Sequence, residues 1–275
     1  MGALKAHGGT VRRSICLHCL FGTPIWLSSM LASKVGDGRC STMDSPVHQP
    51  VSTETLVDVV EGRLREDVIN GVWEPGARLG VEDLRHRYAT GATPIREALS
   101  RLYAEGLVAM VHNRGFRVPL MSLEDLLDIS RTRAAIEMAA VHHAVEFGDS
   151  RWEDAMHSAF AILERRAEQT FSIQAERLAY HDAHHAFHVA LLSGCRVPRL
   201  MALQARLELQ HSRYYRRLPF GVVTGPARLL EHRRLFELAL ARDAPAAAAA
   251  VAEHVMLTAH YVQANNFSDI AFLGA

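Results

Sequence analysis

Histidine is the residue type with the widest chemical use in this sequence. The chain contains 16 histidines, and an imidazole nitrogen can ligate a metal ion and titrates near neutral pH. His184 and His188 stand four residues apart, so on a helix they would project from one face. A lone histidine is more often packed or solvated, so a metal site would need this pair and ligands from other helices.

The cysteines of this sequence give little indication of a chemical role. Cys16, Cys19 and Cys40 fall in the first forty residues, and Cys195 alone lies in the body of the chain. Cys16 and Cys19 form a C-x-x-C, but no second Cys or His pair follows at zinc-ribbon spacing. Chance spacing is therefore the favoured interpretation, and no disulfide framework is expected.

The charge balance requires any contact with nucleic acid to be local. Thirty basic residues oppose thirty acidic ones in the chain, and nine arginines oppose ten acidic residues between Glu54 and Pro119. DNA binding by this segment would depend on its cations sharing one side, namely Arg85, Arg87, Arg96, Arg101, Arg114 and Arg117.

The elements that would carry these arginines form a helix-turn-helix pattern. Apolar residues at i, i+3, i+4 spacing predict a helix over 53–70 and a shorter one over 81–88. After a glycine-containing turn, Thr93 is expected as the N-cap and Pro94 as the first residue of a helix that ends at Glu105. In this arrangement the second helix of the motif enters the major groove.

A β-hairpin is expected directly after these helices. Residues 107–111 and 116–119 have strand-like composition, and the turn between them runs from His112 to Gly115. Such a hairpin is a wing. Arg114 and Gly115 at its tip suit contact with phosphate or with the minor groove.

From Ser122 onward the periodicity is helical throughout. No strand-like alternation of any length appears, and glycine and proline punctuate the segments. The expected helices are 124–146, 151–169, 172–193, 197–216, 226–242 and 244–264. The predicted fold class is therefore mainly α, with an N-terminal winged helix-turn-helix followed by an all-helical antiparallel bundle.

The expected domains follow from these elements. The winged helix-turn-helix should occupy 51–119 and the effector-binding bundle 120–265, with a tail at 266–275. Residues 1–50 are rich in Gly and Ser and are expected to form a disordered extension, with Met43 as an alternative natural start.

An apolar stretch over 15–32 follows Arg12 and Arg13 and leaves export open as an alternative. Cys, His and Gly interrupt the stretch, and the downstream segments have cytoplasmic character. We therefore expect a cytoplasmic protein without a membrane-bound part.

Three segments carry a family signature: 71–79, 93–108 and 113–118. They resemble the GntR superfamily of bacterial transcription regulators. The resemblance implies that double-stranded operator DNA is contacted by the start of the recognition helix and by the wing tip. The matching residues, with a further helix cation, are Thr93, Arg96, Arg101, His112, Arg114 and Gly115.

Arg96 is the best candidate for reading a base. A guanidinium can make a bidentate contact with guanine, which contributes about 1–3 kcal/mol of discrimination. The sequence departs from the family pattern at Gly91 and Ala92, where a Ser or Thr followed by Arg is common, so two polar contacts are missing.

The second half of the chain carries a further pattern in 133–137, 184–192, 232–240 and 252–256. These segments resemble the FCD-type effector domain of the FadR subfamily, most closely its carbon-starvation-induced regulator branch. That resemblance implies control of glutarate and 4-aminobutyrate catabolism.

Metal-binding members of this subfamily use an Asp and three His, which implies a site at His184, His188, His232 and His254. His184 replaces the Asp and keeps the one-turn spacing. His232 and His254 come from two other helices and can converge with the first pair in a bundle core. Four imidazoles suit a divalent zinc or nickel ion, or copper, better than magnesium or calcium.

Neutral imidazole ligands leave the ion its full charge, which favours an anionic effector. We expect a small mono- or dicarboxylate, of which glutarate is an example. Arg133 and Arg213 are the candidate clamps for its other end, although each has a solvated or ion-paired arginine as its plain alternative.

The sequence therefore predicts a repressor that a carboxylate releases, acting as a homodimer on a palindromic operator. Two alternatives stay open. One is a metal-free regulator whose histidines pack as a core. The other is a metal-dependent hydrolase, which the lack of H-E-x-x-H and of a general base disfavours. No enzymatic activity is expected.

Overall fold

The structure is a computed structural model that describes residues 55–168, 174–218 and 226–265. The chain divides into two units, 1–52 and 53–275, and every described residue belongs to the second. The predicted extension, with its three cysteines, and the predicted tail lie outside the described residues. Among the described helices, none is both long and apolar enough to cross a membrane.

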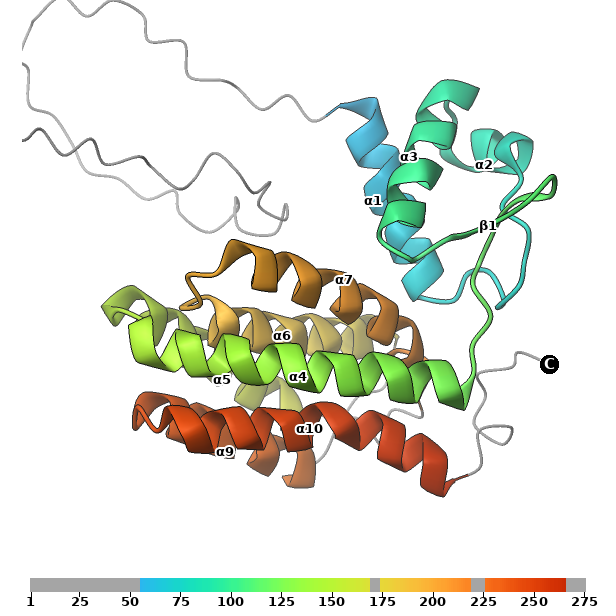
Figure 1. Cartoon of the computed structure of the whole chain (residues 1–275). Helices are drawn as coiled ribbons and strands as arrows, with labels where there is room; N and C mark the ends of the chain where they lie inside the picture. The colour runs from blue at the N-terminus through green and yellow to red at the C-terminus, as the bar shows by residue number, and fades with distance from the viewer. Residues whose placement is uncertain (1–54, 169–173, 219–225, 266–275) are drawn as a thin grey trace, which may run out of the picture. The chain divides into compact units, whose positions relative to one another are not determined.

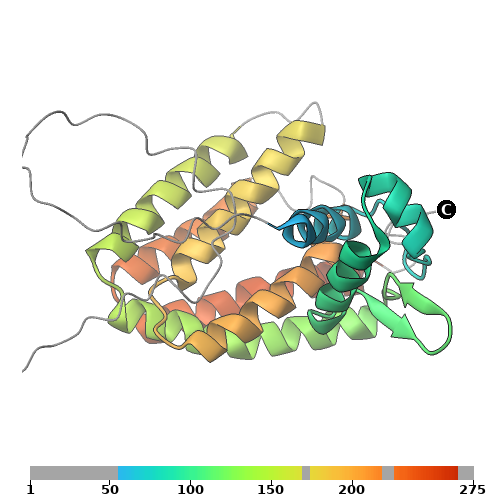
Figure 2. The same cartoon turned by 90° about the horizontal axis from the view of Figure 1, so that it is seen from above.

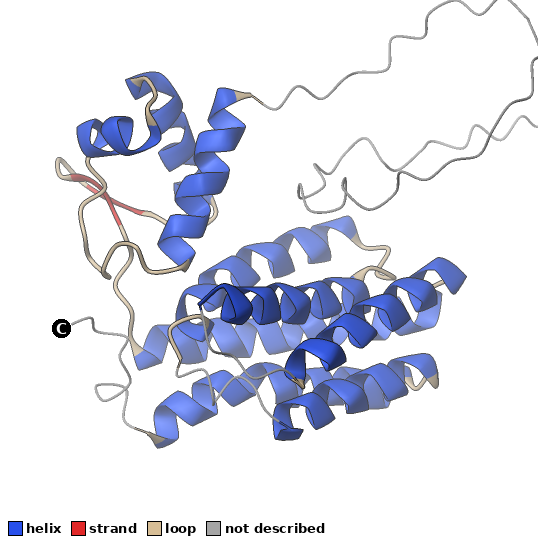
Figure 3. Cartoon of the chain, turned by 180° about the vertical axis from the view of Figure 1, so that it is seen from behind, coloured by secondary structure: helices blue, strands red, loops and turns tan. Residues whose placement is uncertain are grey.

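Three helices and a short hairpin form the N-terminal part of the described chain (Figures 1 and 3). The helices bury a shared apolar core that includes Leu64, Ile95 and Leu99, none of which is exposed to solvent. The elements are α1 (Leu56–Ile69), α2 (Val81–Tyr88), α3 (Ala92–Ala104), β1 (Ala109–Val111) and β2 (Gly115–Arg117).

Helix α1 begins at a capping box. The Thr55 side chain accepts from the backbone N–H of Asp58, and the Asp58 carboxylate accepts from the backbone N–H of Thr55. Each side chain thereby satisfies a backbone donor that has no partner within the helix.

Helix α3 begins two residues earlier than predicted, at Ala92. Its N-cap is Gly91, in an extended conformation (φ −78°, ψ 169°), and not Thr93. Pro94 consequently lies third in the helix rather than first. Proline is tolerated there because the N–H groups of the first turn have no acceptor within the helix in any case.

The hairpin is shorter than its predicted strands. Leu107 and Val108 are buried in the core of the helices, and pairing starts only at Ala109, opposite Arg117. Asn113 and Gly115 turn the chain with positive φ angles of 58° and 77°. Figure 3 shows the two strands of this hairpin in red.

The second part of the described chain is entirely helical. Figure 2 shows its helices from above. Each helix differs from its predicted range by at most two residues at either end. The helices are α4 (Leu123–Phe147), α5 (Ser150–Ala167), α6 (Gln174–Leu192), α7 (Pro198–Tyr215), α9 (Pro226–Leu240) and α10 (Ala244–Ala264).

Helices α4 and α10 form the most extensive contact of the bundle and run side by side (Figure 1). Small buried residues line this seam, including Ala140 and Ala144 on α4 and Ala247 on α10. Their size lets the two backbones approach closely. On the other side, α6 packs against α5. Phe160 of α5 stacks on Phe236 of α9 and meets Phe187 of α6 edge to face.

Candidate functional site

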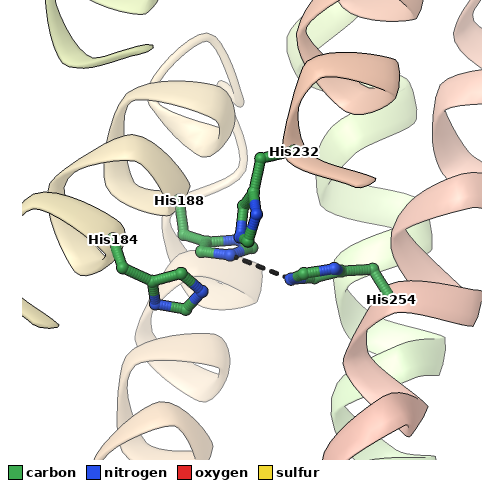
Figure 4. A group of neighbouring side chains, drawn as sticks. All are labelled: His184, His188, His232 and His254. Carbon is green, nitrogen blue, oxygen red and sulfur yellow. Dashed lines mark hydrogen bonds between the residues drawn. The ribbon is translucent and has the colours of Figure 1, made fainter. Parts of the chain in front are cut away.

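Four histidines from three helices meet inside the bundle (Figure 4). His184 and His188 come from α6, His232 from α9 and His254 from α10. One ring nitrogen of each lies within 4.8 Å of the corresponding atoms of the others. His188 and His232 are buried, whereas His184 and His254 are partly exposed.

Packing of the apolar neighbours sets the register of these helices. Phe187 and Leu191 of α6 are buried in the core. Leu235 of α9 is buried in the same core, and so are Val251 and Val255 of α10. Because each helix must bury these residues, the adjacent histidines are directed to one point between the helices.

Polar contacts at Nδ1 of two histidines orient their Nε2 atoms toward the cluster. Nδ1 of His232 lies 2.6 Å from the carbonyl oxygen of Arg228, to which it donates as N–H. Nδ1 of His254 lies 3.5 Å from a carboxylate oxygen of Glu231. Such contacts select the tautomer with a lone pair on Nε2, the arrangement seen around metal-bound histidines.

The geometry fits a metal ion. The Nε2 of His232 is buried and has no hydrogen-bond partner among the described residues. The Nε2 atoms of His188 and His254 lie 3.2 Å apart. Two ligands of a tetrahedral ion at about 2.0–2.1 Å stand about 3.3 Å apart, so this spacing suits zinc.

Burial keeps three of the four imidazoles neutral. Desolvation, followed by the neighbouring histidines, holds the pKa of His184 and of His188 well below the ordinary value of 6.5. The pKa of His232 is lowered in the same way, first by desolvation and then by His254. Neutral imidazole is the form that ligates metals, so these three residues need release no proton near pH 7.

A cavity of about 40 Å³ adjoins the four histidines. This volume is several times the 10–15 Å³ that one water occupies by the same measure. Beyond the histidines, the side chains that line it include Arg133, Glu208, His211, Tyr215, Arg228 and Thr258. Glu208, His211 and Tyr215 share a face of α7 at i, i+3, i+7 spacing, a signal that the sequence interpretation missed.

Arg133 reaches the cavity as predicted, but two carboxylates already hold it. Its Nη2 lies 2.8 Å from Oε1 of Glu137 and 2.5 Å from Oε2 of Glu208. Gln204 donates to the same Glu137 oxygen at 3.2 Å. The arginine is thus part of a buried ion-pair network.

Arg213 does not join the cavity. Its Nη2 donates to the carbonyl oxygen of Pro119 at 2.6 Å, and its side chain is buried there. The structure therefore brings one of the two predicted effector clamps to the histidines and directs the other to the segment between β2 and α4.

Two histidines outside the cluster are also held neutral. Burial lowers the pKa of His181 to about 4, with a smaller contribution from Arg216. Burial, followed by Arg133, lowers the pKa of His211 to about 3. Because the ordinary pKa is 6.5, the unfolded chain binds protons at these residues before the folded one does.

Acidification from pH 7 to pH 5 should therefore destabilise the protein. The stabilisation from His181 and His211 is complete above pH 6.5 and is lost as the pH falls toward 4, by about 2 kcal/mol per histidine at pH 5. Urea unfolding at both pH values measures the loss. The double variant His181→Gln, His211→Gln should show a shallower pH dependence than the unaltered protein, and equal slopes would contradict this assignment.

The proposed DNA-contacting residues all lie at the surface. Thr93 and Arg96 are exposed in the first turns of α3, and His112, Arg114 and Gly115 are exposed at the tip of the hairpin. Among the described residues, no hydrogen bond or ion pair involves the side chain of Arg96 or of Arg114.

The other four arginines that the sequence proposes for a DNA-facing side have partners within the chain. Arg101 pairs with Asp58, Glu61 and Glu97, which ties α3 to α1. The remaining pairs are Arg85 with Glu82, Arg87 with Asp67, and Arg117 with the carbonyl of Gly76. Among these six arginines, Arg96 and Arg114 are therefore the cations best able to approach a phosphate or a base.

Comparison with known proteins agrees with this division of the chain. Residues 56–118 match the gntR family of bacterial regulatory proteins, and residues 128–256 match the FCD domain. An uncharacterized HTH-type transcriptional regulator, BphR of Paraburkholderia xenovorans, is 38% identical over 73% of this chain and 82% of its own. The chain belongs to the GntR family of bacterial transcription regulators.

Other relatives of this GntR-family protein support the same family assignment. The HTH-type transcriptional repressor GlaR of Escherichia coli is 33% identical over 73% of this chain and 92% of its own. The structure of E. coli McbR/YncC, at 23% identity, covers 77% of this chain and 99% of its own with a TM-score of 0.63, which shows a shared fold. These domains and relatives are those of DNA-binding transcription regulators and not of enzymes.

Proposed function

We propose that this regulator is a repressor whose helical domain holds a divalent ion, zinc or nickel, on His184, His188, His232 and His254. A small mono- or dicarboxylate bound beside the ion would release the protein from its operator. The observation that carries the proposal is the convergence of four imidazole nitrogens within 4.8 Å on three helices. When bound, the ion would supply a double positive charge that attracts an anion.

The metal-free alternative accounts less well for the same residues. Histidines that merely pack as a core would leave the buried Nε2 of His232 without a donor or an ion. A buried polar atom without a partner costs about 1–3 kcal/mol. A divalent cation satisfies this atom and its three neighbours together.

The DNA-contacting surface proposed for the operator comprises Thr93, Arg96, His112, Arg114 and Gly115. Arg101 would support it indirectly, since its ion pairs hold α3 against α1. We further propose a cytoplasmic homodimer that reads a palindrome with half-sites about 34 Å apart. The domain limits of 51–119 and 120–265, and membership of the carbon-starvation-induced regulator branch, belong to the same proposal.

The relatives, and not the geometry, support repression as the mode of action. The E. coli relatives GlaR and the galactonate operon regulator are both named transcriptional repressors. Coupling between effector and operator of about 1–3 kcal/mol would release DNA by about 5- to 150-fold.

Metal analysis of protein purified without a His tag tests the central claim. We expect one zinc or nickel ion per chain, and release of a promoter fragment in a gel-shift assay when a small carboxylate is added. His157→Gln, at an exposed histidine of α5, is the matched control and should keep the ion. Untagged protein without a bound metal would overturn the metal claim. Insensitivity of the DNA complex to every carboxylate tested, including glutarate and 2-hydroxyglutarate, would overturn the effector claim.

A further inference from the structure

The cavity beside the four histidines contains more fixed charge than the metal proposal uses. Arg133 and Arg228 both line it, and each is already paired. Arg133 contacts Glu137 and Glu208, and Arg228 donates to both carboxylate oxygens of Glu231 at 3.1 and 3.3 Å. Neither guanidinium is therefore available as an uncompensated cation for a second carboxylate.

Glu208 is the acidic residue of this network that faces the cavity. Burial alone would raise the pKa of Glu208, but Arg133 first, and then His211, His185 and the Ser212 hydroxyl, together lower the pKa to about 2. The side chain is therefore ionised under all ordinary conditions. Three carboxylates against two guanidiniums leave one negative charge around the cavity, and a divalent ion on the histidines would change it to one positive charge.

This charge balance matches a single carboxylate. A monoanion bound at the ion leaves the surroundings neutral. A dicarboxylate adds a further negative charge near Glu208, where burial makes an uncompensated charge strongly unfavourable.

The hydrogen-bonding capacity of Glu208 indicates what the rest of the ligand carries. Its Oε1 accepts from the Ser212 hydroxyl at 3.3 Å. Its Oε2 is buried and lies 2.5 Å from Arg133 Nη2 without the alignment of a hydrogen bond. A carboxylate can accept about four hydrogen bonds, so Glu208 has lone pairs left for a donor. A ligand hydroxyl supplies such a donor without changing the charge balance.

We propose that the effector is a small hydroxy-substituted monocarboxylate, with its carboxylate at the four histidines and its hydroxyl donating to Glu208. This inference rests on the proposed metal and effector site. It names Glu208 as the residue that selects a hydroxy acid over a plain acid and over a dicarboxylate. A ligand that donated to Glu208 from an ammonium group would be a zwitterion with no net charge. The positive charge of the metal-loaded site would then stay uncompensated.

Calorimetric titration of the full-length, metal-loaded protein with matched ligands tests the selection. The probes are butanoate, 4-hydroxybutanoate, 4-aminobutanoate and glutarate, together with propanoate, 3-hydroxypropanoate, 3-aminopropanoate and succinate as a shorter set. In at least one set we expect the hydroxy acid to bind at least tenfold more tightly than the other three. A site that uses a ligand hydroxyl rejects analogues that lack it, because its own polar group is then left unpaired.

Glu208→Gln removes the negative charge and keeps the shape of the side chain. We expect this variant to keep its metal, to lose most of the preference for the hydroxy acid and to bind the dicarboxylate several-fold more tightly than the unaltered protein does. Glu146→Gln, at an exposed glutamate of α4, should leave every affinity unchanged.

The outcomes separate the two claims. Tighter binding of the dicarboxylate, the plain acid or the amino acid by the unaltered protein would overturn the hydroxy acid assignment and leave the carboxylate effector standing. An absence of binding by all eight ligands to protein shown to contain its metal would instead count against the carboxylate effector itself. Because the ligand series with the unaltered protein is decisive by itself, the test does not depend on the variant folding.

Discussion

Removal of the proposed ion with a chelator should lower the melting temperature of the untagged protein by about 10 °C. The four proposed ligands on α6, α9 and α10 would tie three helices together, and an ion that binds only the folded state at a thousandfold excess over its Kd stabilises it by about 4 kcal/mol. For a folded part of this size, each kcal/mol corresponds to about 2–4 °C. Differential scanning calorimetry with and without chelator measures the effect.

Variants identify the cluster as the source of this stabilisation. The double variant His188→Gln, His232→Gln should melt at the same temperature with and without chelator, because both buried ligands are gone. His157→Gln should respond like the unaltered protein, since its side chain lies at the surface of α5. A chelator response that persists in the double variant would place the ion elsewhere.

Arg96→Ala should weaken operator binding by about 5- to 150-fold per half-site, which corresponds to about 1–3 kcal/mol for a bidentate contact with guanine. Arg96 is exposed near the start of α3, and no described residue pairs with its guanidinium. Fluorescence anisotropy with operator and scrambled DNA at a fixed salt concentration measures both affinities.

The conservative change separates base reading from phosphate contact. Arg96→Lys keeps the charge but loses the planar fork, so affinity for scrambled DNA should be retained while the preference for the operator falls. Arg151→Ala removes an exposed charge at the start of α5 and should alter neither affinity. If Arg96→Lys keeps the full preference, Arg96 contacts phosphate and another residue reads the bases.

Helix positions could be predicted from the sequence because they depend on local spacing. The apolar periodicity around Phe160, Phe187 and Val251 records which face of each helix is buried, and the structure places all three in the core. The one-turn spacing of His184 and His188 is a property of a single helix, so their shared face also follows from the sequence.

The start of α3 shows where a local rule failed. Thr93 and Pro94 together have the composition of a helix start, yet the helix begins two residues earlier, at Ala92, with Gly91 as its cap. Glycine is accepted as an N-cap almost as readily as threonine, so composition alone did not separate the two.

The tertiary structure decided the partners of the charged residues. Arg213 donates to Pro119, 94 residues away, and Arg101 pairs with Asp58, 43 residues away, although both were expected to contact a ligand. A long side chain takes the partner that packing brings within reach, and that partner leaves no trace in local spacing.

The histidine cluster also depends partly on local spacing and partly on contacts between helices. The sequence by itself determined that this chain has helices carrying histidines at one-turn spacing, and its signature segments identified its family. Only the tertiary structure placed Glu208 and His211 beside those histidines and engaged Arg133 with two carboxylates. The physical reason is that burial and ion pairing depend on distances between helices, whereas helix formation depends on neighbours along the chain.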